Sequence, residues 1–184
     1  MHPERIGNEP GSHVTHARPP SDAELDTAAR GLGRALVKRG WQMASAESCT
    51  GGLVGHVITQ VPKSSDHYLG GIVSYSDAVK EELLEVQREL LASVGAVSAE
   101  VAEAMTTGAL ARFPVARIVV AVTGIAGPDG GSADKPVGLT YVAAAIRDGA
   151  AVVERHTWPF DRDGNKRASA LAAIELAARV TSEA

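Results

Sequence analysis

Cysteine, aromatic side chains and long apolar runs are all scarce in this chain of 184 residues. The only cysteine is Cys49, which excludes intrachain disulfide bonds and zinc sites built from several cysteines. Aromatic residues make up 4% of the chain, so its core must consist mainly of Ala, Val, Leu and Ile. No apolar run reaches the roughly 18–20 residues that a membrane span needs, and the N-terminus has no apolar segment typical of a secretory signal. We therefore expect a cytoplasmic protein that contacts no membrane.

Charge and histidine spacing argue against two further classes of function. The formal net charge is −4, whereas nucleic-acid surfaces depend on Lys and Arg. A local cationic pocket for one phosphate remains compatible with this charge. The six histidines show no HExxH or HxH spacing. We expect no nucleic-acid partner, no metal and no cofactor.

The chain has the length of one domain. Residues 1–20 are rich in Pro, Gly, His and polar residues, and we expect them to form a disordered tail. The folded domain is expected to span residues 21–184. Its first helix is predicted to begin at the capping box formed by Ser21 and Glu24, and to end at Gly40.

The remaining pattern alternates strands with helices and then ends in a hairpin. Strands are predicted at 41–46, 68–75 and 117–123, and the last, RIVVAVT, has the continuous apolar character of a strand buried on both faces. Two further strands, 138–146 and 151–158, flank the hairpin signal Asp148-Gly149. Helices are predicted from Leu53 to Val61, over the segment after Ser76 or Asp77 that carries Lys80, Leu83 and Leu84, and from Ser98 to Phe113. A polar turn is predicted at 161–166, and an Ala-rich helix at 168–180. The pattern predicts an α/β fold: a three-layer α/β/α sandwich with a mixed, mostly parallel sheet of about five strands.

Three polar or Gly-rich segments follow the first three strands: 47–52, 75–80 and 123–131. In open α/β sheets, ligands bind beyond the carboxyl ends of the strands. If the three strands run in the same direction, these segments meet in one crevice, which is the predicted site.

Ser48 lies at the expected junction of strand and helix and is a candidate nucleophile. A helix start beside it would offer unpaired N–H groups to an oxyanion, and Gly51 and Gly52 would let a substrate approach the backbone. Spacing alone favours a simpler interpretation, in which Ser48 or Thr50 caps the helix. Cys49 is a rival nucleophile, although a lone small cysteine is more often a buried apolar residue.

A nucleophilic serine needs a base or a positive neighbour. His56 should point away from the helix start, and His67 precedes the second strand, at the end opposite the crevice. Lys80 and Tyr75 follow that strand and are better placed. A lysine in low-dielectric surroundings loses its proton more easily, but a lone lysine is usually a solvated charge, so both interpretations stay open.

The loop 124–136 is a weaker candidate for a phosphate site. Gly124, Gly127 and the glycines that follow can expose successive N–H groups to an anion. The loop matches neither G-x-x-x-x-G-K-[ST] nor G-x-G-x-x-G, and a plain connecting loop fits nearly as well. Lys135 and Arg162 are candidates for the positive charge that a phosphate needs.

Five segments together are similar to one protein family, the CinA C-terminal domain family. They are AESCTGGLVGHVIT (46–59), GGIVSYSDAVKEELLEV (70–86), GAVSAEVAEAM (95–105), VTGIAGPDGGSADKPVGLTY (122–141) and FDRD (160–163). The resemblance runs from about residue 24 to the C-terminus. Enzymes of this family are nicotinamide-nucleotide amidohydrolases, so the resemblance implies hydrolysis of nicotinamide mononucleotide to nicotinate mononucleotide and ammonia, as in NAD recycling.

The resemblance also implies roles for single residues. It places the nucleophile at Ser48, and an active-site tyrosine and lysine at Tyr75 and Lys80, without deciding which of the two is the base. The implied substrate contacts are Thr50, Gly51, Gly52, Ser65, Thr123, Gly124, Gly127 and Arg162.

Asp77 departs from the family pattern, because Asn is usual there. Its charge is expected to raise the pKa of Lys80 and so weaken it as a base. The chain resembles the stand-alone form of the family, acting on a small nucleotide, and its Ala-rich helices suggest a homo-oligomer, dimer or higher. Two alternative functions remain: a non-catalytic nucleotide-binding module related to competence or DNA damage, and hydrolysis of another small amide or phosphorylated metabolite.

Overall fold

The structure is a computed structural model that describes residues 18–184, so most of the predicted disordered tail, residues 1–17, lies outside the described residues. In chain order its elements are α1 (Asp22–Arg39), β1 (Met43–Glu47), α2 (Leu53–Gln60), the 3-10 helix η1 (Ser64–Asp66), β2 (Tyr68–Val73), α3 (Asp77–Leu84), α4 (Arg88–Val94), α5 (Ala99–Arg112), β3 (Ile118–Gly124), β4 (Leu139–Ile146), β5 (Ala151–Thr157) and α6 (Arg162–Glu183). Of the helices, α4 has no counterpart in the sequence prediction.

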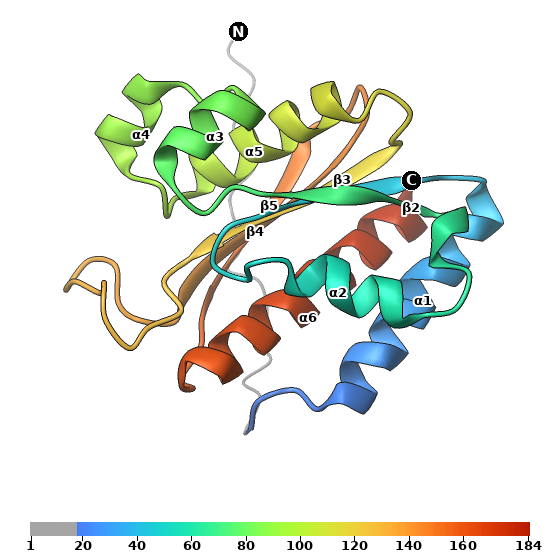
Figure 1. Cartoon of the computed structure of the whole chain (residues 1–184), viewed down its shortest axis with the longest axis horizontal. Helices are drawn as coiled ribbons and strands as arrows, with labels where there is room; N and C mark the ends of the chain where they lie inside the picture. Colours follow the sequence, from blue (N-terminus) through green and yellow to red (C-terminus); the bar gives the residue numbers. More distant parts are fainter. Residues whose placement is uncertain (1–17) are drawn as a thin grey trace, which may run out of the picture.

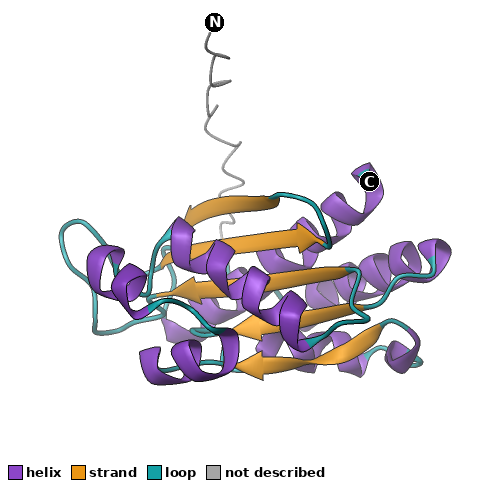
Figure 2. Cartoon of the chain, turned by 90° about the horizontal axis from the view of Figure 1, so that it is seen from above, coloured by secondary structure: helices purple, strands orange, loops and turns teal. Residues whose placement is uncertain are grey.

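Five strands form one mixed sheet between two layers of helices (Figures 1 and 2). The strand order is β2-β1-β3-β4-β5. The first three strands are parallel, and β4 and β5 are added in antiparallel fashion. Helices α3, α4 and α5 cover one face, while α1, α2 and α6 cover the other (Figure 1). The predicted α/β/α sandwich with a mixed sheet is confirmed, with its parallel pairings confined to the β2-β1-β3 half.

Strand β3 lies at the centre of the sheet and divides its side chains between two cores. Ile118, Val120 and Val122 pack into the core under α1, α2 and α6, whereas Val119 and Ala121 pack into the core under α5. Because both faces are buried, the strand is continuously apolar from Ile118 to Val122, which is why it was recognisable from its sequence.

Helices α1 and α6 pack against each other, and α6 also packs directly against β3 and β4 of the sheet. The capping box of α1 is formed as predicted: the Ser21 side chain accepts from the Glu24 N–H, and the Glu24 carboxylate accepts from the Ser21 N–H. Small side chains predominate where α6 is buried. None of the helices within residues 18–184 is long and apolar enough to cross a membrane.

Helix α6 begins at Arg162, six residues before the predicted start, so the prediction of a polar turn at 161–166 is wrong. The Asp161 side chain accepts from the Gly164 N–H at 2.8 Å and caps the helix. The buried Asn165 side chain accepts from the Phe160 N–H and donates to the Ala126 carbonyl. Polar side chains thus tie the helix start to the neighbouring loop, which apolar periodicity does not detect.

The carboxyl ends of the three parallel strands meet at one edge of the sheet, as predicted. Glu47 at the end of β1 is in register with Val73 of β2 and Val122 of β3. The segments that follow these strands are therefore neighbours, and they contain the candidate site.

Candidate active site

Ser48 lies directly after β1 in a tight turn before α2. Its N–H donates to the Val122 carbonyl at 2.9 Å, which fixes the turn to the central strand. Gly51 and Gly52 have φ angles of 63° and 98°, in the left-handed region that favours glycine. The turn leaves the Ser48 side chain 7% exposed, with its Oγ 3.2 Å from Nζ of Lys80.

Lys80 projects from α3 into the protein rather than into solvent. It is 1% exposed, and Nζ donates to the Ser74 carbonyl at 2.8 Å as well as to Ser48. Burial lowers the pKa of Lys80 below its usual 10.5, while the nearby Asp77 opposes this shift. The expected influence of Asp77 is present, but burial outweighs it. The interpretation of Lys80 as a solvated charge is wrong, and the residue has the surroundings of a general base.

Glu47 caps α2, and the interpretation of Ser48 or Thr50 as the cap is wrong. The Glu47 carboxylate is 2% exposed and accepts from the backbone N–H groups of Gly52, Val54 and Gly55 at 2.9–3.0 Å. Sequence reasoning missed this residue; its one signal is a carboxylate that ends a buried strand just before a Gly-rich turn. By holding the turn, Glu47 fixes the position of Ser48.

The capping carboxylate also changes which N–H groups are free for an oxyanion. The Gly52 N–H donates to Glu47 and the Gly51 N–H donates to the Ser48 carbonyl, so neither is free, contrary to the expectation that the helix start would serve. In contrast, the N–H groups of Cys49 and Thr50 donate to no other residue within 18–184, although the Cys49 N–H faces its own thiol.

Two buried hydroxyls lie next to this group of residues without a partner among the described residues: Thr50 Oγ1 and Ser74 Oγ. Thr50 belongs to the Ser48 turn, and Ser74 supplies the carbonyl that binds Lys80. Buried polar atoms without partners are uncommon in folded proteins, so they indicate a place for water or a polar ligand.

Cys49 is not a rival nucleophile in this arrangement. Its thiol is buried, and burial raises its pKa to about 12. Because the thiolate is the reactive form, this cysteine is inert at neutral pH.

Arg162 connects the segment that follows β2, which contains Tyr75, to the Gly-rich loop 124–136. Its Nη1 donates to the Gly127 carbonyl at 2.6 Å, and its Nη2 donates to the Tyr75 hydroxyl at 3.2 Å. Tyr75 is 61% exposed, and its hydroxyl accepts from Arg162 rather than bonding to Ser48 or Lys80. Of the two candidate bases, Lys80 and not Tyr75 therefore forms a hydrogen bond with Ser48 Oγ. A cavity of about 450 Å³ adjoins Arg162, lined by Ala126, Pro128, Val137, Phe160, Asp161, Arg162 and Asp163.

Gly124, the last residue of β3, and Gly127, in the loop that follows, lie too close to other residues to carry a side chain. A Cβ on Gly124 would meet the Leu139 carbonyl oxygen at 2.7 Å, and one on Gly127 would meet Val137 at 2.5 Å. Lys135 of the same loop donates to the Val94 carbonyl. The loop contributes to the site through the Gly127 carbonyl, which accepts from Arg162 and holds its side chain in place.

The structure does not bring the other expected residues into contact with Ser48. Ser65 is exposed in η1, which precedes β2 and so lies at the opposite end of the sheet. The Thr123 hydroxyl donates to the Ala96 carbonyl and fastens β3 to the segment before α5. His56 is exposed on α2, and His67 lies at the far end of β2, both as predicted. No group of three or more His, Cys, Asp or Glu among the described residues is arranged to bind a metal ion.

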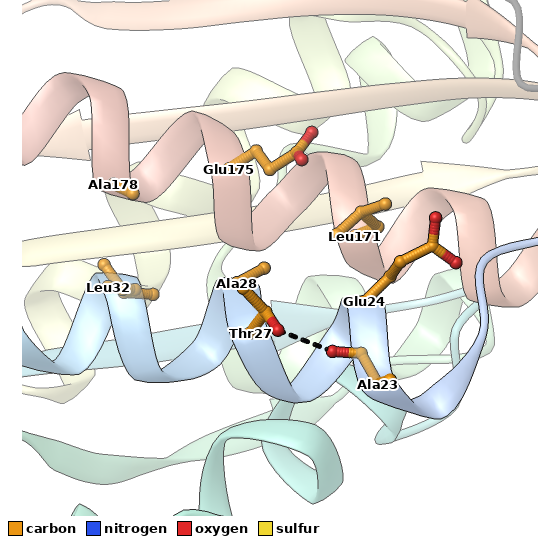
Figure 3. Close-up of a pocket in the computed structure, with 9 residues that line it drawn as sticks. Ala23, Glu24, Thr27, Ala28, Leu32, Leu171, Glu175 and Ala178 are labelled. Carbon is orange, nitrogen blue, oxygen red and sulfur yellow. Dashed lines mark hydrogen bonds between the residues drawn. The ribbon is translucent and has the colours of Figure 1, made fainter.

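A second and larger hollow, of about 530 Å³, lies between α1 and α6 (Figure 3). Its lining is largely apolar, with the carboxylates of Glu24 and Glu175 at its edge. Glu24 is already bound by Arg18 and Ser21. The hollow contains neither Ser48 nor Lys80, so it is not the candidate site.

Comparisons with known proteins identify the family of this chain. Residues 25–181 match the model of the CinA C-terminal domain. The chain is 40% identical over 159 residues to a protein of Enterobacter agglomerans named nicotinamide-nucleotide amidohydrolase PncC, covering 86% of this chain and 96% of that protein. It is 49% identical over 126 residues to a CinA-like protein of Desulfotalea psychrophila, covering 68% of this chain and 30% of that one. The chain spans about a third of the length of several curated relatives that it matches, among them those from Desulfotalea psychrophila and Geotalea uraniireducens.

Solved structures show the same fold. A competence/damage inducible protein CihA from Agrobacterium tumefaciens superposes with a TM-score of 0.80 at 37% identity, over 88% of this chain and 96% of that one. A CinA superfamily protein from Klebsiella pneumoniae gives a TM-score of 0.83 at 30% identity, over 87% and 99% of the two chains. The chain therefore belongs to the CinA C-terminal domain family.

Proposed function

We propose that this protein is a cytoplasmic amidohydrolase that converts nicotinamide mononucleotide to nicotinate mononucleotide and ammonia, with Ser48 as nucleophile and Lys80 as general base. The observation that carries the proposal is the contact between Lys80 Nζ and Ser48 Oγ, at 3.2 Å and almost sealed from solvent. A relative that covers most of this chain is named for that activity.

In the first half of the reaction, neutral Lys80 accepts the proton of Ser48 as the Oγ attacks the carboxamide carbon. The hydrogen bond to the Ser74 carbonyl keeps Nζ in place whether the amine is neutral or charged. The N–H groups of Cys49 and Thr50, which donate to no other described residue, are the available donors for the oxyanion, and the N–H that follows a nucleophile commonly has this role. Charged Lys80 then gives its proton to the leaving nitrogen, and ammonia departs.

In the second half, water attacks the acyl-enzyme ester. Lys80 accepts a proton from this water and returns it to Ser48 Oγ as the ester breaks. Nicotinate mononucleotide leaves, and the starting protonation states are restored. The whole cycle uses one amine as both base and acid, which requires a pKa below that of an ordinary lysine.

Arg162 serves as a substrate-positioning group in this proposal. Its guanidinium lies between the glycine loop and Tyr75, at the edge of a cavity. Thr50, Gly51 and Gly52 form the wall beside Ser48. We further propose a homo-oligomer as the functional form, and neither a metal nor a cofactor in the reaction.

The proposal is tested by measuring ammonia release from nicotinamide mononucleotide, nicotinamide riboside and nicotinamide by the purified full chain, with and without a chelator. We expect turnover of the mononucleotide in both conditions. Ammonia release from nicotinamide riboside or nicotinamide, but not from the mononucleotide, would support the alternative function, hydrolysis of another small amide. Tight calorimetric binding of the mononucleotide without ammonia release would support the non-catalytic nucleotide-binding module.

A further inference from the structure

Lys166 lies beside the nucleophile turn although nothing in the sequence pattern marks it. It is in the second turn of α6, and its Nζ is 3.9 Å from the position that a Cβ on Gly51 would occupy. Its positive charge acts on the thiol of Cys49, as does that of Lys80. Helix α6 packs against α2, so Lys166 reaches from the start of α6 toward the turn that precedes α2.

Lys166 and Arg162 are one helical turn apart and reach toward the same site. Residues four positions apart lie on one face of a helix. Arg162 reaches Tyr75 and Gly127, while Lys166 reaches Gly51, so this face of α6 runs from the tyrosine segment to the nucleophile turn. Arg167 points elsewhere: it donates to the Pro20 carbonyl and pairs with Asp22.

Neither cation is neutralised by a carboxylate among residues 18–184. The described partners of Arg162 are a carbonyl and a hydroxyl, and Lys166 forms no ion pair or hydrogen bond with a described residue. Lys166 is nevertheless half-buried. Two positive groups on one helix face, one beside the Ser48 turn and one beside Tyr75, neither paired with a described carboxylate, are suited to an anionic ligand.

We propose that Lys166, together with Arg162, binds the phosphate monoester of the substrate and so selects a phosphorylated ribonucleoside amide over its unphosphorylated form. This inference rests on the proposed function and adds a specificity-determining residue to it. The guanidinium supplies directed hydrogen bonds to phosphate oxygens, and the ammonium supplies a point charge on a flexible stem.

The test compares the wild type with Lys166→Gln on nicotinamide mononucleotide and on its riboside. We expect kcat/KM for the mononucleotide to fall by about 10- to 100-fold, mainly through KM, because one charge-assisted contact is lost. The riboside should change less than about twofold, because it has no phosphate to lose. The KM of Lys166→Arg for the mononucleotide should stay close to that of the wild type. Equal losses on both substrates, or no loss on either, would overturn the proposal.

Lys38→Gln is the matched control, because it removes the same charge from an exposed site at the end of α1. It should leave the kinetics of both substrates unchanged. Thermal unfolding shows whether each variant is folded.

Calorimetric binding of ribose 5-phosphate separates this inference from the proposed function, because the probe has a phosphate but no amide. We expect the wild type to bind it at least about tenfold more tightly than Lys166→Gln does. If the wild type binds the probe through Lys166 but releases no ammonia, the subsite stands and the amidase proposal fails. If the enzyme turns over but the variant binds the probe equally well, the subsite fails alone.

Discussion

Replacing Glu47 by Gln tests whether a buried carboxylate holds the nucleophile in place. Each oxygen of Glu47 accepts two hydrogen bonds: Oε2 from the N–H groups of Gly52 and Val54, and Oε1 from the Gly55 N–H and the Ser45 hydroxyl. Glutamine keeps the shape of the side chain but replaces one acceptor by an NH₂ group. It also removes the negative charge at the start of α2.

The expected loss of stability follows from the orientation that the amide must choose. Its NH₂ group should face Ser45, because a hydroxyl can turn to accept, and this leaves the Gly55 N–H unsatisfied. A buried donor without a partner costs about 1–3 kcal/mol, and loss of the charge at a helix start costs about another 1 kcal/mol. The total of about 2–4 kcal/mol corresponds to a fall in Tm of about 5–15 °C for a chain of this size.

Activity should fall further than stability alone explains. A displacement of Ser48 Oγ by about 1 Å costs on the order of 100-fold in rate, so kcat of folded Glu47→Gln should be reduced by about that factor. Thermal unfolding and ammonia release are the two measurements. Glu81→Gln is a suitable control: it breaks the exposed pair with Arg88 and should cost less than about 1 kcal/mol. Wild-type Tm and kcat in Glu47→Gln would refute the capping role.

Three further changes have defined outcomes. The kcat of the wild type should rise with pH toward an apparent pKa below 10.5, because burial lowers the pKa of Lys80 and the neutral amine is the base. A flat pH–rate profile of the wild type would contradict this role of Lys80. The Lys80→Arg variant should lose at least about 1,000-fold in kcat at every pH. Cys49→Ala should keep kcat within about threefold, since the buried thiol stays protonated, and thiol alkylation should not inhibit the native enzyme. Asp161→Ala removes the cap of α6 and should lower the free energy of unfolding by about 1 kcal/mol, measured by urea denaturation.

The lowered pKa of Lys80 should also make the free energy of unfolding depend on pH. Because the pKa of Lys80 is lower in the folded state, the unfolded chain binds more protons between that lowered pKa and 10.5. The contribution of Lys80 to stability therefore increases as the pH rises through this interval. Urea denaturation of the wild type and Lys80→Met across the interval isolates this contribution, which the variant should lack.

The parts of the fold that were predictable depend on local rules. The run RIVVAVT is apolar because β3 is covered on both faces, and the Ser21–Glu24 box is visible because its spacing alone defines it. The meeting of three strand ends followed from parallel pairing, which the alternation of strands and helices already indicated.

What the sequence did not show depends on contacts between distant segments. The burial of Lys80 arises from packing of α3 against the rest of the fold, and the same lysine on a free helix would be solvated. Glu47 looks like an ordinary charged residue until the turn wraps around its carboxylate. The start of α6 was missed because Asn165 and Asp161 satisfy their polar groups through a loop and a cap rather than through apolar periodicity.

Ammonia release by Ser48→Ala, followed beside the wild type under single-turnover conditions with nicotinamide mononucleotide, separates a reactive hydroxyl from a structural one. Removal of Oγ leaves the buried amine of Lys80 and the Glu47 cap in place, so the variant should fold normally and bind the nucleotide. We expect the rate to drop by at least about 1,000-fold, as when other serine nucleophiles are removed. An alanine variant that releases ammonia at the wild-type rate would show that Ser48 does not attack the amide.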